Sequence, residues 1–198
     1  FVGMLFVSGI RLRLVRIIAT VGVLLMPLAW FVLKDYQKQR ILVFMNPDID
    51  PFGSGYHIIQ SKIAIGSGTI FGKGLFNGTQ SQLNFLPENH TDFIFSVIGE
   101  ELGFIGCIFV LILLFMLIYR SIKVAYSCND RFGMLLTTGI GSMLCFEVLV
   151  NAGMTMGIMP VTGIPLPFIS YGVSALTTNM ISVGILLNIS MQRKKYIF

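Results

Sequence analysis

Charged residues are scarce in this sequence. Only 12% of its 198 residues are Asp, Glu, Lys or Arg, and 55% are hydrophobic, whereas an ordinary soluble domain carries about 25% charged residues. A water-soluble globule of this length could not bury so much apolar surface. Disordered chains and nucleic-acid-binding tails need charge-rich stretches that are missing here. The composition therefore predicts a membrane protein and excludes nucleic acid as a partner.

Cysteine is also rare, and its spacing carries no metal or redox motif. Each of the three cysteines lies in or beside a predicted helix, so we expect small thiols buried in the membrane or facing the cytoplasm; they are Cys107, Cys128 and Cys145. The sequence begins at Phe1 inside an apolar run, with no initiator Met and no basic n-region of a signal peptide. We therefore expect residues 1–198 to be one membrane domain from a longer protein.

Long uncharged runs locate the membrane spans. They cover 17–33, 102–119 and 148–192, and prolines interrupt the last run. A hydrocarbon core about 30 Å thick needs about 20 helical residues, so we expect transmembrane helices near 17–33, 94–119, 132–156 and 169–191. Barrel strands would alternate in polarity at every second residue, which these runs do not do. The expected fold is an all-α polytopic membrane bundle, with residues 1–10 as the stub of an earlier span.

The positive charges predict the orientation of this bundle. Nine of the 14 Lys and Arg residues lie in three short segments, 11–16, 120–131 and 192–198, which fall on one side of the predicted spans. The positive-inside rule makes this side cytoplasmic. The long loop 34–93 and the short link 157–168 are then extracytoplasmic, and the net charge of +5 needs no acidic partner to explain it.

The long extracytoplasmic loop is richer in patterns than a simple connection. Apolar residues within 56–65 recur at helical spacing, which predicts a short amphipathic helix. This helix either lies on the membrane surface or only packs on the bundle. Five glycines follow within 66–78. Their spacing fails the Walker phosphate-binding pattern, but it leaves a flexible loop in which Lys73 could meet a phosphate.

An acidic cluster ends the loop, with Glu88, His90 and Asp92 directly before the next predicted helix. In one interpretation Thr91 or Asp92 caps this helix, because free N–H groups and the helix dipole favour a carboxylate there. In the other, Asp92 is a general base at the lipid–water boundary. The helix terminus would lower the pKa of Asp92 and burial would raise it.

Three further glutamates fall within the predicted membrane helices. Glu100 and Glu101 lie two turns into their helix and are expected either to face water or to line a polar groove. Glu147 stands between long apolar runs. An ionisable residue at that depth is either functional or kept neutral and hydrogen-bonded to a neighbouring helix.

Two long motif blocks point to a known family. The first contains GYHIIQSKIAIGSG, GKG, NGTQSQ, FLPE, HTDFIF and EELG between Gly55 and Gly103; the second contains Asn151 and then GIMPVTGIPLPFISYG up to Gly172. Together they cover most of 46–175 and resemble the SEDS family (shape, elongation, division, sporulation). The sequence Tyr56–Gly68 is more similar to the elongation members of this family than to its division members.

The match to this family departs from the usual pattern in two ways. Val173 stands where the family usually has a second glycine after Ser-Tyr-Gly, so any close helix crossing at that position would be spread. In addition, family members have more membrane helices than this chain, which would hold the last four plus a stub.

The resemblance implies a peptidoglycan glycosyltransferase that builds glycan strands for cell elongation and rod shape. Such an enzyme polymerises lipid II, the undecaprenyl-pyrophosphate-linked disaccharide, on the outer face of the bacterial cytoplasmic membrane, with a class B penicillin-binding protein as its transpeptidase partner. The essential loop aspartate of the family matches Asp92. A carboxylate there would take the proton from the attacking sugar hydroxyl.

Cations near this carboxylate would stabilise the charge that develops on the leaving pyrophosphate. The expected substrate-binding residues are Arg40, Lys62, Lys73, Gln80, Gln82, Glu88 and His90. The sequence assigns no cofactor, and a divalent cation, Mg²⁺ or Mn²⁺, held by Asp92 or Glu88 would serve the same purpose. Two other functions stay open: a flippase for lipid-linked precursors, in which Glu147 would matter more than Asp92, and a non-catalytic scaffold of the elongation machinery.

Overall fold

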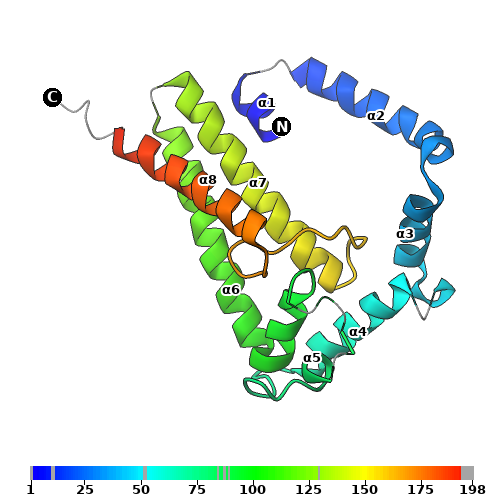
Figure 1. Cartoon of the computed structure of the whole chain (residues 1–198). Coiled ribbons are helices and arrows are strands. Elements are labelled where there is room, and N and C mark those ends of the chain that lie inside the picture. Colours follow the sequence, from blue (N-terminus) through cyan, green and yellow to red (C-terminus); the bar gives the residue numbers. More distant parts are fainter. Residues whose placement is uncertain are drawn as a thin grey trace.

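The computed structural model describes residues 2–9, 12–50, 53–83, 85–86, 88, 90–128 and 130–192. The helices in chain order (Figure 1) are α1 (Val2–Val7), α2 (Leu12–Val32), α3 (Asp35–Met45), the 3-10 helix η1 (Pro47–Ile49), α4 (Ser54–Ser67), α5 (Thr79–Gln82), α6 (Ile94–Tyr126), α7 (Arg131–Thr155) and α8 (Val173–Gln192). No strand occurs in these described ranges, which confirms the all-α fold.

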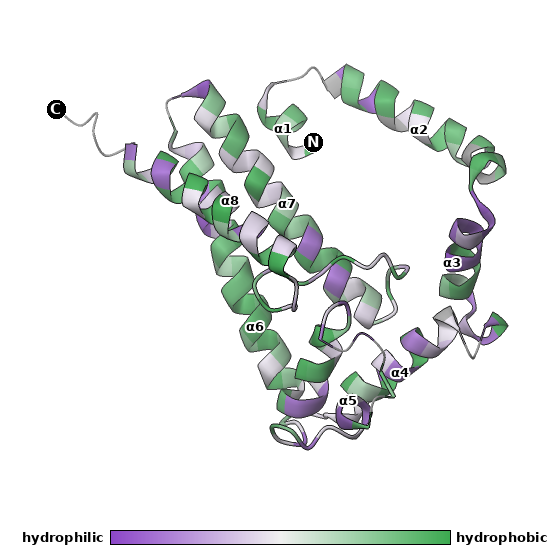
Figure 2. Cartoon of the chain, viewed as in Figure 1, coloured by the Kyte–Doolittle hydropathy of each residue, from purple (hydrophilic) through white to green (hydrophobic). Residues whose placement is uncertain are grey.

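Three described helices, α6, α7 and α8, are long and apolar enough to cross a membrane. Helix α6 packs along α7, and α8 lies beside both. Buried apolar side chains such as Leu144 and Phe95 form the core between them. The outward faces of the same helices are also largely apolar (Figure 2), as lipid contact requires. These features confirm a polytopic membrane protein.

Helix α2 covers all but the last residue of the expected span 17–33, and it begins earlier, at Leu12. It extends away from the other helices (Figure 1) and exposes apolar side chains such as Phe31. Part of the expected cytoplasmic segment 11–16 is therefore helical. Of the expected cytoplasmic segment 192–198, residues 193–198 lie outside the described residues.

The membrane helices differ in their ends from the expected ranges. Helix α6 continues to Tyr126 and contains a kink at Gly103, whose φ of 67° is not helical. Helix α7 lies within one residue of the expected 132–156. Helix α8 begins at Val173 and not at 169, because hydrogen bonds hold the preceding residues in a loop.

The helix expected near 56–65 is α4, and it packs on the bundle. Ile58 and Ala64 are buried against the neighbouring elements. The hydroxyl of Ser61 donates to the backbone carbonyl of Thr155 in α7 at 2.6 Å and lies 2.6 Å from the hydroxyl of Ser96 in α6. These contacts fix the long loop 34–93, called the outer loop below, on the ends of two membrane helices.

Candidate functional site

The candidate site forms where the end of the long loop meets the segment between α7 and α8. We call this segment, residues 156–172, the outer link. Asn151 of α7 is fully buried and donates through Nδ2 to two carbonyl oxygens, that of Asp92 at 3.0 Å and that of Ile164 at 2.8 Å. One amide group therefore joins the loop to the outer link.

Two further hydrogen bonds join the end of the long loop to the outer link. The hydroxyl of Ser170 donates to the carbonyl oxygen of Thr91 at 2.7 Å and accepts from the backbone N–H of Leu166 at 2.7 Å. The backbone N–H of Tyr171 donates to the carbonyl oxygen of His90 at 2.8 Å. Because these bonds engage residues 166–171, helix α8 cannot start before Val173.

The side chain of Asp92 is half-buried beside the outer link. None of the described residues donates a hydrogen bond to its carboxylate. Gly163 passes so close that a Cβ atom there would lie 3.3 Å from Oδ2, and its φ of 71° also favours glycine. The carboxylate is thus positioned by backbone contacts and left open for another group.

The capping interpretation of Asp92 is wrong in this structure. The N-cap residue of α6 is Phe93, and no side chain caps this helix. Burial instead raises the pKa of Asp92 above its ordinary value of 3.8, the nearby Glu88 raises it further, and Arg40 lowers it. The net direction is upward, which suits a group that must accept a proton near neutral pH.

Two of the expected cationic residues border the outer link. Arg40 of α3 donates from Nη1 to the carbonyl oxygen of Val161 at 3.1 Å. The exposed side chain of Lys62 from α4 passes directly against Gly157, where a Cβ atom would overlap it. Arg40 and Lys62 thus both contact the outer link, four residues apart along it.

Lys73, which was expected to meet a phosphate, contacts groups of the protein instead. Its Nζ forms an ion pair with Glu100 at 2.9 Å and donates to the hydroxyl of Thr79 at 2.9 Å. The Glu100 carboxylate is fully buried and also accepts from the backbone N–H groups of Gln80 at 2.9 Å and Ser81 at 3.1 Å. Glu100 therefore neither faces water nor lines a groove, and Lys73 is not free for a phosphate.

The glycine-rich loop is also held, not flexible. The backbone N–H groups of Lys73 and Gly74 donate to the carbonyl oxygens of Glu100 and Glu101, each at 3.0 Å. The side chain of Glu101 is half-buried on α6. Sequence patterns revealed the glycines but not the buried carboxylate that organises them.

Three other expected substrate-binding residues lie in two places: two of them are on α5, and the third is near Asp92. The side-chain oxygen of Gln80 is buried beside the Glu100 cluster without a hydrogen-bond partner, and Gln82 is exposed on α5. Glu88 is exposed near Asp92 and accepts from the Thr91 hydroxyl at 3.0 Å.

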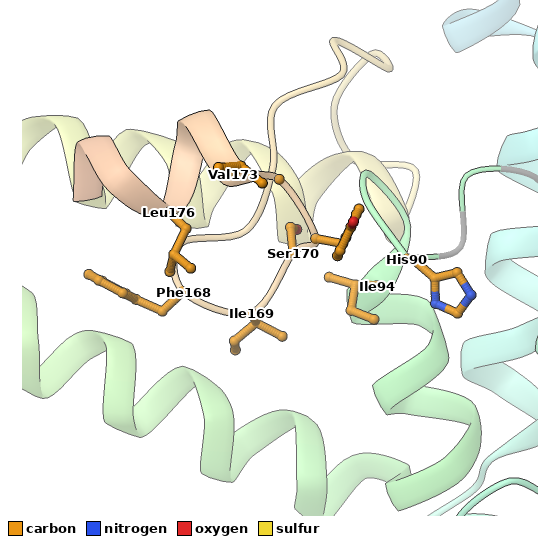
Figure 3. A pocket seen from close by; sticks show the side chains of 9 residues that line it. His90, Ile94, Phe168, Ile169, Ser170, Val173 and Leu176 are labelled. Carbon is orange, nitrogen blue, oxygen red and sulfur yellow. The ribbon is translucent and has the colours of Figure 1, made fainter. Parts of the chain in front are cut away.

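His90 lines a pocket of about 510 Å³ between the start of α6 and the start of α8 (Figure 3). The other lining residues are mostly apolar: Ile94, Phe168, Ile169, Ser170, Tyr171, Gly172, Val173 and Leu176. Val173 is 73% exposed at the first turn of α8, so in the described structure it spreads no close helix crossing. The pocket offers an apolar surface directly beside the Asp92 segment.

Glu147 lies on α7 within the membrane and interacts with the Asn179 side chain of α8. One of its carboxyl oxygens is buried without a hydrogen-bond partner among the described residues. The described part of the chain gathers no group of three or more His, Cys, Asp or Glu side chains that could hold a metal ion.

Comparisons with known proteins give a consistent picture. The model of the FtsW/RodA/SpoVE family, described as cell cycle protein, matches residues 1–195. Peptidoglycan glycosyltransferase MrdB of Escherichia coli K12 is 49% identical over 191 residues, which are 96% of this chain and 52% of MrdB. Peptidoglycan glycosyltransferase RodA of Treponema pallidum is 48% identical over 162 residues, which are 82% of this chain and 37% of that protein.

A solved structure gives the same family likeness. It concerns the structural coordination of polymerization and crosslinking by a peptidoglycan synthase complex, and it superposes with a TM-score of 0.75 at 33% identity. The match covers 97% of this chain and 53% of that one. The chain thus spans about half the length of the curated relative MrdB.

Proposed function

The chain belongs to the FtsW/RodA/SpoVE (SEDS) family of cell cycle proteins, and we propose that it carries the outer site of a peptidoglycan glycosyltransferase that polymerises lipid II for cell elongation. The observation that carries this proposal is the half-buried Asp92 carboxylate, to which no described residue donates a hydrogen bond. Arg40 lies near it and an apolar pocket adjoins its segment. This arrangement suits a polar reaction on a lipid-linked substrate.

In the proposed reaction, Asp92 takes the proton from the attacking sugar hydroxyl. The hydroxyl oxygen then bonds to the anomeric carbon of the growing chain. The bond from this carbon to the pyrophosphate oxygen breaks, and its electron pair leaves with the undecaprenyl pyrophosphate. A positioned general base contributes typically 10²–10⁴-fold to the rate of such a step.

Arg40 and Lys62 are the proposed partners of the leaving pyrophosphate. Both are exposed and both contact the outer link, and Arg40 also lies near enough to Asp92 to lower its pKa. A cation aimed at the developing charge lowers the barrier most when water is excluded. Lys73 is assigned instead to positioning the loop, because its ammonium group is already paired with Glu100.

The pocket beside His90 is the proposed location of the first isoprene units of the lipid carrier. Its lining is mostly apolar, and it includes Val173 and Leu176 from the start of α8. The polar side chains that line this pocket are those of His90, Ser170 and Tyr171. Gln80 and Gln82, which lie with the Glu100 cluster and on α5, are left without a substrate role.

A divalent cation, Mg²⁺ or Mn²⁺, would be held by Asp92 and Glu88 together with the substrate pyrophosphate. When bound it would supply positive charge to the leaving group. The transpeptidase partner would be a class B penicillin-binding protein, in line with the polymerization and crosslinking named for the similar synthase complex. The location would be the bacterial cytoplasmic membrane, with Asp92 on its outer face.

The test is a reconstitution of the full-length parent protein with purified lipid II. We expect glycan strands from the wild type and none from Asp92→Ala, with both proteins inserted in the membrane, and a chelator arm reports any need for a metal ion. A flippase would instead move lipid II across vesicles without forming glycosidic bonds, and Glu147→Gln would impair it more than Asp92→Ala. A scaffold would tolerate both changes as long as its partner still bound.

A further inference from the structure

The segment between α4 and α5 passes the lower end of α6 (Figure 1), and it carries a cluster of exposed apolar side chains. We call residues 69–76 the loop tip. Four of its side chains are largely exposed, with exposed fractions of 57% for Ile70, 80% for Phe71, 63% for Leu75 and 79% for Phe76. Single exposed apolar residues are ordinary, but a cluster of this kind marks a contact surface.

Backbone hydrogen bonds fix the loop tip to the start of the membrane-spanning part of α6. The N–H of Phe104 donates to the carbonyl oxygen of Thr69 at 3.0 Å, and the N–H of Ile105 donates to that of Ile70 at 3.2 Å. Both donors lie directly after the kink at Gly103. The loop tip therefore occupies the same depth as the first residues of the straight part of α6.

That depth is the outer boundary of the hydrocarbon core. At 1.5 Å per residue, the stretch 104–126 is about 34 Å long, which matches a hydrocarbon core of about 30 Å. Phe104 and Ile105 are 61% and 51% exposed, so they face lipid at the end of this stretch. The exposed apolar side chains of the loop tip adjoin this lipid-facing end of the helix.

The polar groups of the loop tip turn the other way. Lys73 at its centre is tied to Glu100 through both its ammonium group and its backbone N–H, at 2.9 and 3.0 Å. The N–H of Gly74 donates to the carbonyl oxygen of Glu101, and that of Gly72 to the carbonyl oxygen of Gly68. Backbone groups satisfied in this way tolerate an apolar environment.

The backbone of the loop tip is also strained. Thr69 and Phe76 adopt φ values of 52° and 62°, in the left-handed region that ordinary residues avoid. The surrounding contacts maintain this conformation, in which the apolar side chains of the loop tip lie outside the protein core.

We infer that the loop tip is a membrane anchor, whose apolar side chains insert into the outer leaflet at the boundary between headgroups and acyl chains. Continuity with the lipid-facing residues of α6 favours lipid as the occupant over a partner protein. Through the Lys73–Glu100 pair, the anchor fixes the height of the whole outer loop above the bilayer.

The experiment places an environment-sensitive fluorophore on the full-length protein in phosphatidylcholine–phosphatidylglycerol vesicles. Native cysteines are replaced first, and NBD is attached at Phe71→Cys, at Leu75→Cys as a second position, and at Gln82→Cys as the matched control on α5. Lipids with a doxyl group on acyl carbon 5 should quench the two tip labels at least twofold more than the control label. Aqueous iodide should show the opposite order.

Either of two results would overturn the inference. One is that iodide quenches the tip labels as strongly as the control while doxyl lipids do not. The other is that the tip labels become protected only after a partner protein is added to the vesicles. Because each tip side chain is already largely exposed, the label needs no repacking, and thermal unfolding of each labelled protein checks that the fold is intact.

Discussion

At the scale of single residues, the environment of Asp92 decides how it ionises. Burial and Glu88 raise its pKa, whereas Arg40 lowers it. A general base works in its deprotonated form, so the polymerisation rate should rise with pH through the pKa of this carboxyl group. The acidic limb of the pH–rate profile should therefore lie above the range of an ordinary aspartate.

Replacing the two neighbours should move this limb in opposite directions. Glu88→Gln removes a like charge and should shift the acidic limb to lower pH, while Arg40→Gln removes an opposite charge and should shift it to higher pH. The measurement is the initial rate of lipid II polymerisation against pH for each full-length variant. Shifts of the same sign would show that another group controls the limb.

A substitution at Gly163 tests how close the outer link must lie to the Asp92 carboxylate. Gly163→Ala places a methyl group 3.3 Å from Asp92 Oδ2 on a backbone with positive φ, and the left-handed conformation alone costs roughly 1–2 kcal/mol. We expect about a tenfold loss of polymerisation rate, because the methyl group displaces the carboxylate from its position. Gly66→Ala, which adds its methyl group into open space on α4, is the matched control and should keep the wild-type rate.

At the scale of elements, the membrane helices follow from the sequence because bilayer thickness sets their length and composition. The start of α8 could not be predicted, since hydrogen bonds from Ser170 and Tyr171 to the distant loop residues Thr91 and His90 decide it. Asp92 could be proposed from its polar neighbourhood and its family motif. The positioning role of Asn151 could not, because its hydrogen bonds to Asp92 and Ile164 join distant parts of the chain. Tertiary contacts leave no periodic signal in a sequence.

The ion pair between Lys73 and Glu100 predicts an asymmetry in stability. Lys73→Met leaves a fully buried carboxylate without its cation, which costs roughly 3 kcal/mol or more. Glu100→Gln leaves an ammonium group that is 28% exposed and can turn to water, so it should cost less. Thermal unfolding of the full-length variants in detergent should rank Glu100→Gln above Lys73→Met in Tm, and the reverse ranking would contradict this account.

At the scale of the whole molecule, the charged ends of the helices lie on one side. Arg13 and Arg16 begin α2, Arg120 and Lys123 lie near the end of α6, and Arg131 begins α7, whereas α4 and α5 lie at the opposite end of the bundle (Figure 1). From this distribution the positive-inside rule predicts that the candidate site lies outside the cytoplasm.

Labelling with a membrane-impermeant maleimide checks this orientation. In the full-length protein without native cysteines, Gln82→Cys should react in intact spheroplasts. Tyr126→Cys, which is 93% exposed at the end of α6, should react only after the membrane is opened. Reaction of Tyr126→Cys in intact spheroplasts would invert the topology and remove Asp92 from the outer face.

The central claim is that one outer carboxylate accepts the proton of the attacking sugar. Its most direct test is the initial rate of glycan formation from purified lipid II by the full-length protein carrying Asp92→Asn, beside Asp48→Asn as an exposed control aspartate on η1. The account predicts a loss of about 10²-fold or more for Asp92→Asn and a wild-type rate for the control. A near-normal rate from Asp92→Asn would contradict it.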